Sequence, residues 1–389
     1  WVGVLIHVND LNTDIGVGVV AGHGITCGIR KRAAAGRTGV GAVMGSKKIK
    51  AIAFRGNKSK ALADPDGIKA LAGSLVQRAR ESGVADAYRS MGTPMLVDVT
   101  NEMGLHPTRN FTKGVNPNRR KLDADAVMDI KIGDRACASC PLGCGNFTSV
   151  NGVQVEGPEY ETLCLGGSNC EVNDMEQVMR FNRKCDDLGL DTMSTGNVIG
   201  LAMALTESGG ADLGLIFGDG AAYLDVLDEI ATRSTDRGRD LSLGSARLAD
   251  KYGQADQAAH AKGLEMPAYD PRGNYGMGLA YATSERGACH LRAFPLFAED
   301  PFKLKALASE VVAAQNVNGA KWSMCFCDFW GWVDTAIMTD LGFTDIRITL
   351  KEQSRQFIRD WLPGSRIEDY VVSATIEAVK PLPDDSDGE

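Results

Sequence analysis

The sequence predicts an α+β protein in which a glycine-rich, β-prone first segment is followed by mainly helical domains. Residues 1–57 are rich in glycine and β-branched residues, with candidate strands at residues 17–20 and 49–54. From Asp64 onward, apolar residues recur at helical spacing. The length of 389 residues and the hydrophobic share of 44% suffice for two or more domains with cores of their own.

Caps and apolar stripes place three helices. Asp64 and Pro65 begin the first, whose apolar stripe consists of Ile68, Leu71, Leu75 and Val76. Asn173 or Asp174 begins the second, which we expect to end near Gly189, because glycine readily adopts the left-handed conformation of a C-cap. The third begins within residues 191–196.

Two later segments carry charge patterns. Residues 236–262 are charged and alanine-rich, so we expect a solvated helix that leads to a domain boundary near Gly263. Residues 384–389 are acidic and are predicted to be a disordered tail.

Composition excludes several function classes. The net charge of −8 and the pI near 5.3 argue against nucleic acid or an anionic membrane as a general partner. No apolar run is long enough to span a bilayer, and no signal peptide is visible, so we expect a cytoplasmic protein. The chain begins at Trp1, which indicates a fragment or a processed product.

Four of the ten cysteines form the most informative pattern. Cys137, Cys140 and Cys144 share one short loop, and Cys325 is a remote fourth thiol. A local Cys-x2-Cys-x3-Cys with one distant cysteine is a common ligand set for a 4Fe-4S cluster. Zinc is the alternative, although the one-residue gap between Cys325 and Cys327 suits a zinc knuckle poorly. Disulfides are a further alternative that a cytosolic compartment disfavours.

The glycine-rich residues 35–47 match neither a Walker loop nor a Rossmann fingerprint, so a tight turn and a ligand cradle both remain open. Together with other segments, however, they form a set in a fixed order. These segments are residues 35–47, 137–144, 157–162, 186–192, 269–273 and 286–292. In that order and spacing, from about residue 30 to 335, the set resembles the tungsten-dependent aldehyde:ferredoxin oxidoreductase family.

The resemblance implies a domain organisation. Members have a β-rich first domain that holds a bis-pterin tungsten cofactor, followed by two mainly helical domains. Residues 1–57 correspond to the end of the first domain, residues 58–262 to the second and residues 263–389 to the third. The fold class implied is therefore the C-terminal part of a pterin-binding domain with two helical domains.

The resemblance also implies the cofactor ligands. Cys137, Cys140, Cys144 and Cys325 fall on the cluster ligands, with Cys327 as a rival for Cys325. Contacts to the pterins, their phosphates and the Mg²⁺ that bridges these phosphates fall on Arg32, Ala33, Asp186, Gly189, Leu190, Asp191, Thr192, Arg292 and Met324. Met324 lies in a second pterin motif whose usual aspartate and glycine are replaced here by Ala320 and Ser323.

Glu161 and His290 match the two family residues that face the metal. A carboxylate there can accept a proton as water or hydrated aldehyde is activated, and an imidazole can hydrogen-bond the developing oxyanion. Taken alone, a solvated glutamate and a structural histidine would be the ordinary interpretations. Arg180 and Arg183 occupy positions where some members bind an interface iron, so we expect no metal there, while a homodimer through other surfaces stays open.

The function predicted is oxidation of a small aldehyde to a carboxylic acid by a tungsten or molybdenum bis-pterin cofactor, with electrons passing through the 4Fe-4S cluster to ferredoxin or to other electron-transfer subunits. Two alternatives remain. One is a reductive family member that acts on aryl-CoA thioesters, and the other is an inactive or electron-relay iron-sulfur subunit that lacks tungsten.

Overall fold

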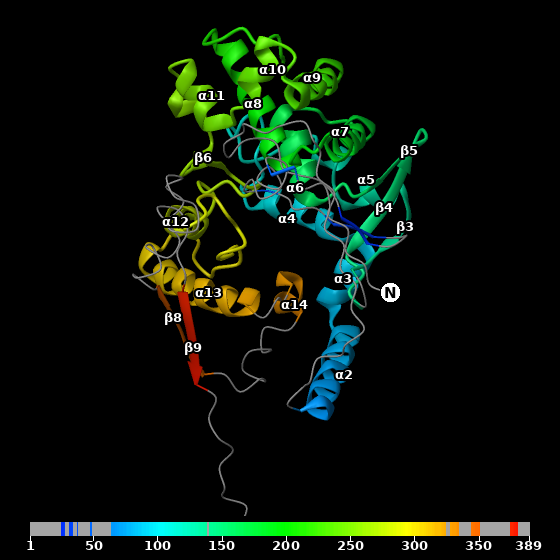
Figure 1. Ribbon diagram of the computed structural model, residues 1–389, viewed down its shortest axis with the longest axis vertical. Helices are drawn as coiled ribbons and strands as arrows, with labels where there is room; N and C mark the ends of the chain where they lie inside the picture. The colour runs from blue at the N-terminus through cyan, green and yellow to red at the C-terminus, as the bar shows by residue number, and fades with distance from the viewer. Residues whose placement is uncertain are drawn as a thin grey trace, which may run out of the picture. The chain divides into compact units, whose positions relative to one another are not determined.

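The structure is a computed structural model that describes residues 25–27, 31–33, 37, 47–48, 64–137, 140–323, 327–333, 344–350 and 374–379 (Figure 1). The chain divides into two compact units. Unit 1 consists of Trp1–Asn274 with Arg286–Cys289, and unit 2 consists of Tyr275–Glu285 with His290–Glu389. The strands predicted at residues 17–20 and 49–54, and the acidic tail, lie outside the described residues.

Unit 1 is mainly helical in its described part. Its α-helices are α2 (Pro65–Glu81), α3 (Gly83–Met91), α4 (Leu96–Glu102), α5 (Ala124–Met128), α6 (Tyr160–Thr162), α7 (Met175–Leu188), α8 (Thr192–Ser208), α9 (Gly220–Thr232), α10 (Asp236–Leu241) and α11 (Ser245–Lys251). Short 3₁₀ turns are η1 (Thr93–Met95), η2 (Arg119–Lys121), η4 (Ser168–Cys170) and η5 (Ala255–Gln257), and η3 (Leu163–Gly167) is a π-helical turn.

The described strands of unit 1 form three small antiparallel sheets. They are the pair β1 (Ile25–Cys27) and β2 (Lys31–Ala33), the three-stranded sheet β3 (Lys131–Arg135), β4 (Gly145–Val150) and β5 (Val153–Glu156), and the pair β6 (His260–Ala261) and β7 (Leu264–Glu265). The β3–β4 connection contains the cysteine loop.

Helix α8 is the central helix of unit 1, with α7, α10, α11 and η3 packed against it (Figure 1). Its residues from Ser194 to Met203 are buried, so this stretch is enclosed on all sides and has no solvent-exposed face. Gly196 permits this packing, because a Cβ there would lie 2.4 Å from the carbonyl oxygen of Leu165 in η3. Beside it, the rings of Phe181 in α7 and Tyr223 in α9 stack at 4.9 Å.

The helix starts predicted from capping residues are confirmed. Asp64 caps α2, Asp174 caps α7 and Asp191 caps α8, each with a side-chain oxygen that accepts a backbone N–H of the first turn. Gly189 ends α7 at φ 77°, as the left-handed C-cap requires. The apolar stripe of α2 is not a buried face, however, since Ile68 is 49% exposed.

The single solvated helix expected over residues 236–262 is wrong. The segment forms α10 and α11 instead, separated by Gly244 at φ 85° and followed by a turn with Gly253 at φ 68°. Left-handed glycines interrupt a helix because they end its hydrogen-bonded ladder. Leu241 and Leu248 are fully buried, so these helices belong to the core of unit 1.

Unit 2 contains α12 (Tyr275–Thr283), α13 (Leu304–Ser323), α14 (Asp328–Val333) and the antiparallel pair β8 (Thr344–Leu350) and β9 (Ala374–Val379). Helix α12 packs on α13, and their shared core includes Ala280, Ala293 and Val311. The three-domain division of the sequence stays a prediction.

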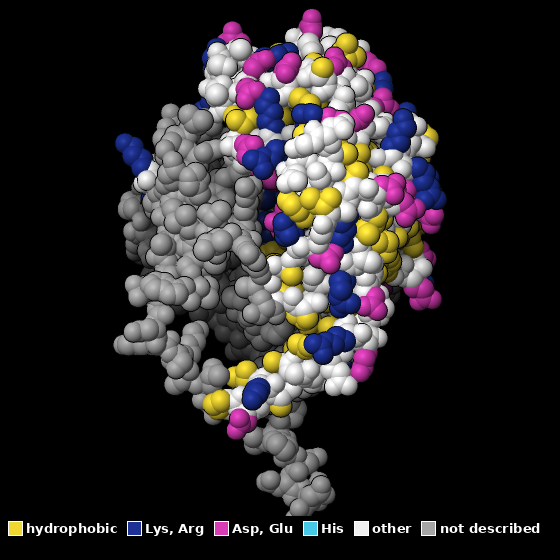
Figure 2. Space-filling view, turned by 90° about the vertical axis from the view of Figure 1, so that its right-hand side faces the viewer, with side chains coloured by type: hydrophobic (Ala, Val, Ile, Leu, Met, Phe, Trp, Pro, Cys, Tyr) yellow, Lys and Arg dark blue, Asp and Glu magenta, His cyan; other side chains and the backbone are white. Residues whose placement is uncertain are grey.

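The mainly helical character of the predicted fold is confirmed, with only small sheets among the described residues. On the face shown in Figure 2, acidic and basic side chains of the described residues are interspersed. The net charge of −8 is thus not gathered into one acidic patch on this face. Among the described residues, no helix is long and apolar enough to cross a membrane.

Candidate active site

The junction of α7 and α8 presents two carboxylates close together in the chain. Asp186 lies in the last turn of α7, where its Oδ2 accepts a hydrogen bond from Asn182 at 3.1 Å. Asp191 begins α8, and its Oδ2 accepts the backbone N–H of Ser194 at 2.9 Å. Both side chains are partly exposed, whereas Leu190 between them is buried. The junction can therefore accept hydrogen bonds from a ligand rich in N–H groups, as a pterin is.

Glu161 in α6 lies next to this junction. The hydroxyls of Thr162 and Thr192 are 2.9 Å apart, which joins the end of α6 to the start of α8. Glu161 Oε2 accepts the backbone N–H of Ala268 at 2.8 Å. Burial raises the pKa of Glu161 to about 7, while the bond from Ala268 and the charge of Arg37 act in the opposite direction. A carboxyl group with this pKa can both release and accept a proton near neutral pH.

Arg37, one of the few described residues of the glycine-rich segment, reaches the same neighbourhood. Its guanidinium donates to the carbonyl oxygens of Glu265 and Ala288. The Glu265 carboxylate is itself buried, and it accepts from the Ser194 hydroxyl and the Ser245 backbone N–H, each at 2.9 Å. Residues distant in the sequence are thus fixed around the start of α8.

The cysteine loop connects β3 to β4. Arg135 pairs with Gly145, so the ends of the loop lie side by side, with Cys137 two residues beyond the last pair and Cys144 directly before it. Cys137 is exposed, and Cys140 and Cys144 are partly buried. The loop thus carries three thiols and has paired ends. Such thiols, as thiolates, are the usual ligands of a 4Fe-4S cluster.

The described residues do not form a complete metal site. No group of three Cys, His, Asp or Glu side chains is gathered there closely enough to hold a metal ion. Ala138 and Ser139 of the loop, and the predicted fourth ligand Cys325, lie outside the described residues, as does Met324. The rival ligand Cys327 is exposed. The cluster ligands therefore stay a prediction.

His290 and Arg292 belong to unit 2. The ring of His290 lies edge-on to Phe294, with the centroids 6.1 Å apart. Arg292 forms an ion pair with Glu285, and its guanidinium lies 4.4 Å from the centre of the Trp322 ring. A phosphate contact by Arg292 would compete with that ion pair, so its role also stays a prediction.

For the other positions named from the sequence, the structure gives only strand pairing or ion pairs on a helix surface. Arg32 and Ala33 lie in β2, opposite Thr26 and Ile25. Arg180 and Arg183 form ion pairs within α7, with Glu176 at 2.6 Å and Asp187 at 2.8 Å.

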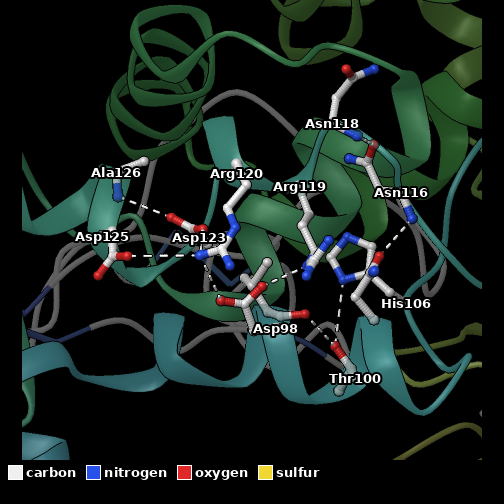
Figure 3. A network of polar contacts seen from close by, with 12 residues as sticks. Asp98, Thr100, His106, Asn116, Asn118, Arg119, Arg120, Asp123, Asp125 and Ala126 are labelled. Carbon is white, nitrogen blue, oxygen red and sulfur yellow. Dashed lines mark hydrogen bonds and ion pairs between the residues drawn. The ribbon is translucent and has the colours of Figure 1, made fainter.

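A polar network is buried at His106 and Thr100 and open to solvent at Arg120 and Asp125 (Figure 3). His106 is fully buried, and its Nε2 lies 2.7 Å from the Ser168 hydroxyl. Burial and the nearby charge of Arg119 lower the pKa of His106 to about 4, so the ring is neutral. Arg119 is held by Asp98 at 2.5 Å. Thr100 lies 3.4 Å from His106 Nδ1 and 3.0 Å from the Tyr160 hydroxyl, which connects the network to α6.

Sequence reasoning missed the residues that hold Glu161 in place. Ala268 acts through its backbone, which leaves no signature in the sequence. Tyr160 and Arg37 fall within the quoted segments, but nothing there distinguishes them from structural residues. Segment 269–273 was singled out, and the residue directly before it proves to make the contact.

Comparison with known proteins identifies the family. Residues 70–352 match the family described as "Aldehyde ferredoxin oxidoreductase, domains 2 & 3". Relatives named "Tungsten-containing aldehyde ferredoxin oxidoreductase" from Thermococcus kodakarensis and Pyrococcus furiosus are each 40% identical over 276 residues, which cover 68% of this chain and 46% of theirs. The chain belongs to the aldehyde ferredoxin oxidoreductase family, as the sequence motifs predict, and it spans about half the length of these curated relatives.

A solved structure shares the fold. The active-site complex BamBC of benzoyl coenzyme A reductase, with bound 1,5-dienoyl-CoA, superimposes with a TM-score of 0.60. The match covers 80% of this chain and 49% of that one at 21% identity. At this identity the match supports the fold alone.

Proposed function

We propose that this chain is part of a tungsten or molybdenum bis-pterin enzyme that oxidises an aldehyde to a carboxylic acid. The observation that carries the proposal is the position of Glu161 beside Asp191 at the α7–α8 junction, with its pKa raised by burial to about 7. The family relatives, whose names state that they contain tungsten, support the choice of cofactor.

The residues have separate tasks in this proposal. Asp186 and Asp191, with Gly189, Leu190 and Thr192, hold a pterin at the start of α8, while Arg32, Ala33, Arg292 and Met324 contribute contacts to the pterins and to their Mg²⁺-bridged phosphates. When bound, the cofactor accepts the two electrons of the oxidation. Glu161 takes up a proton as water or hydrated aldehyde is activated, and His290 hydrogen-bonds the developing oxyanion.

In this proposal, the cysteine loop between β3 and β4 serves electron transfer. Cys137, Cys140, Cys144 and Cys325 would ligate a 4Fe-4S cluster, which would supply one-electron transfer to ferredoxin, the partner that the relatives' names imply. Oxidation of the aldehyde with water also releases two protons for each product, and the Glu161 carboxylate is suited to accept the first.

Turnover of two variants tests these roles. Glu161→Gln and His290→Ala should each retain metal and cluster but lose at least about a hundredfold in turnover of aldehydes with a viologen dye, because each removes a group that acts on the reacting atoms. Glu176→Gln, which alters a partly exposed ion pair in α7, is the control and should keep its turnover.

Two results would count against the proposal. Near-native turnover in either variant with full metal content would remove the role of that residue. Reduction of aryl-CoA thioesters without aldehyde oxidation by the unmodified enzyme would favour the reductive alternative.

A further inference from the structure

Two consecutive residues of α6 hold the same residue of a distant segment. Glu161 Oε2 accepts the N–H of Ala268 at 2.8 Å, and the Tyr160 hydroxyl hydrogen-bonds the Ala268 carbonyl oxygen. Because a carbonyl oxygen can only accept, the phenol proton points at Ala268. We call Tyr160, Glu161 and the Ala268 backbone the α6 clamp.

Tyr160 is itself firmly placed. Its side chain is 1% exposed, and the centroid of its ring lies 5.1 Å from the centroid of the Tyr269 ring. Its backbone N–H donates to the Thr93 hydroxyl at 2.9 Å, and its own hydroxyl lies 3.0 Å from that of Thr100. A buried aromatic side chain fixed at both ends has little freedom to move.

The α6 clamp holds Ala268, which is the middle residue of the segment 266–270. The neighbouring anchors fall two residues to either side, where Asn197 donates to the Met266 carbonyl at 3.0 Å and the Asp270 N–H donates to the Leu105 carbonyl at 2.8 Å. At the centre, the Tyr269 N–H bonds the Pro267 carbonyl at 2.7 Å, which forms a tight turn around Ala268. The orientation of the Ala268 N–H therefore depends on the hydrogen bond that the Ala268 carbonyl oxygen accepts.

We propose that Tyr160 is a positioning residue that aims the Glu161 carboxylate by fixing the Ala268 main chain. The inference rests on the proposed function, because it assigns Glu161 a task at the reacting atoms. Tyr160 need not touch substrate or cofactor for this role. The Tyr160 hydroxyl orients the turn around Ala268, and this turn directs the Ala268 N–H at Glu161 Oε2. Because the carboxylate is rigid and planar, fixing Oε2 also fixes the direction of Oε1.

Turnover of Tyr160→Phe provides the first test. The substitution keeps the ring and removes the bond to Ala268, so kcat should fall roughly tenfold while KM stays within about twofold. The matched control is Tyr223→Phe in α9, which removes a buried hydroxyl that has no hydrogen-bond partner among the described residues. The control should keep kcat.

A titration that does not depend on turnover provides the second test. Infrared difference spectra against Glu161→Gln isolate the Glu161 carboxyl band. Loss of an oriented N–H donor disfavours the charged carboxylate, so Tyr160→Phe should move this titration to higher pH, together with the acidic limb of the pH–rate profile. The charged groups that act on Glu161 are Arg37 and Asp191, and the buried Cys164 thiol lies nearby; the substitution leaves all three in place.

The outcomes separate the clamp from the proposed function. An unchanged titration and pH profile in Tyr160→Phe would overturn the clamp. A shifted titration in Tyr160→Phe, together with full turnover in Glu161→Gln, would keep the clamp and overturn the catalytic role of Glu161. If Tyr160→Phe does not fold, 3-fluorotyrosine at position 160 is a stronger donor that should move the titration to lower pH, and no movement would again overturn the clamp.

Discussion

Glu161 is subject to opposing influences that leave its proton in equilibrium near neutral pH. Burial favours the neutral acid, while the Ala268 N–H and the charge of Arg37 favour the carboxylate. Cys164, three residues further along the chain in η3, is fully buried, and burial raises the pKa of its thiol well above the usual range. Of these neighbouring groups, Glu161 alone is therefore placed to exchange a proton under physiological conditions.

The raised pKa of Glu161 predicts a pH dependence of stability. A carboxyl group that binds its proton more tightly when folded stabilises the protein fully below the unfolded pKa, and this contribution is lost as pH rises through the folded pKa. The window runs from about pH 4.5 to about pH 7. There the free energy of unfolding, relative to Glu161→Gln, should fall by at most roughly 1.4 kcal/mol per pH unit.

Urea unfolding of both proteins at several pH values measures this difference. Other groups titrate in both proteins, so their contributions cancel. A difference that stays constant across the window would show that Glu161 has an ordinary pKa in the folded protein.

The sequence predicts Glu161 as a site residue, because it lies in a segment that resembles a family motif. The environment of Glu161 could not be predicted from the sequence. Ala268 and Glu265 contribute through a backbone N–H and a buried carboxylate roughly a hundred residues further along the chain, and only the tertiary fold brings them to α6 and α8. Such contacts depend on backbone position rather than on side-chain pattern.

At the level of elements, one residue at the start of α8 has both a structural role and a predicted functional role. Asp191 is the N-cap of a buried helix, and its carboxylate is also half of the predicted pterin contact at the junction. The sequence signal for the helix start and the family motif therefore coincide at one residue. Capping alone is enough to explain an aspartate here, so the two roles must be separated by experiment.

Substitutions of Asp191 separate them. Asp191→Ser keeps an N-cap oxygen and should retain stability, whereas Asp191→Ala should lose about 1 kcal/mol of unfolding free energy. Both should lose bound pterin, because neither retains the carboxylate. Asp219→Ala removes the N-cap of α9, where Asp219 accepts from the N–H groups of Ala221 and Ala222, and it should lower stability without loss of pterin.

Thermal melting and pterin content of the purified variants provide the measurement. Full pterin content in both Asp191 variants would reduce Asp191 to a capping residue. The helix starts of α2, α7 and α8 were predictable in this way because side-chain caps leave a local signature. The break between α10 and α11 was overlooked because its signal, a left-handed glycine, lies inside a charged stretch that has helical composition.

On the scale of the whole molecule, unit 1 contains most of the predicted site residues. They are three cysteines in the β3–β4 loop, the carboxylates of Asp186 and Asp191 at the α7–α8 junction, and Glu161 with its raised pKa. His290, Arg292 and the position of Cys325 fall in unit 2. The chain spans about half the length of its curated relatives.

The most direct test is the metal and pterin content of the anaerobically purified protein, with Cys140→Ser as the matched variant. We expect tungsten or molybdenum with two pterins and about four irons per chain, and loss of iron in Cys140→Ser. Iron without tungsten, molybdenum or pterin would contradict the oxidoreductase proposal and favour an electron-relay subunit. Zinc in place of iron would contradict the cluster assignment itself.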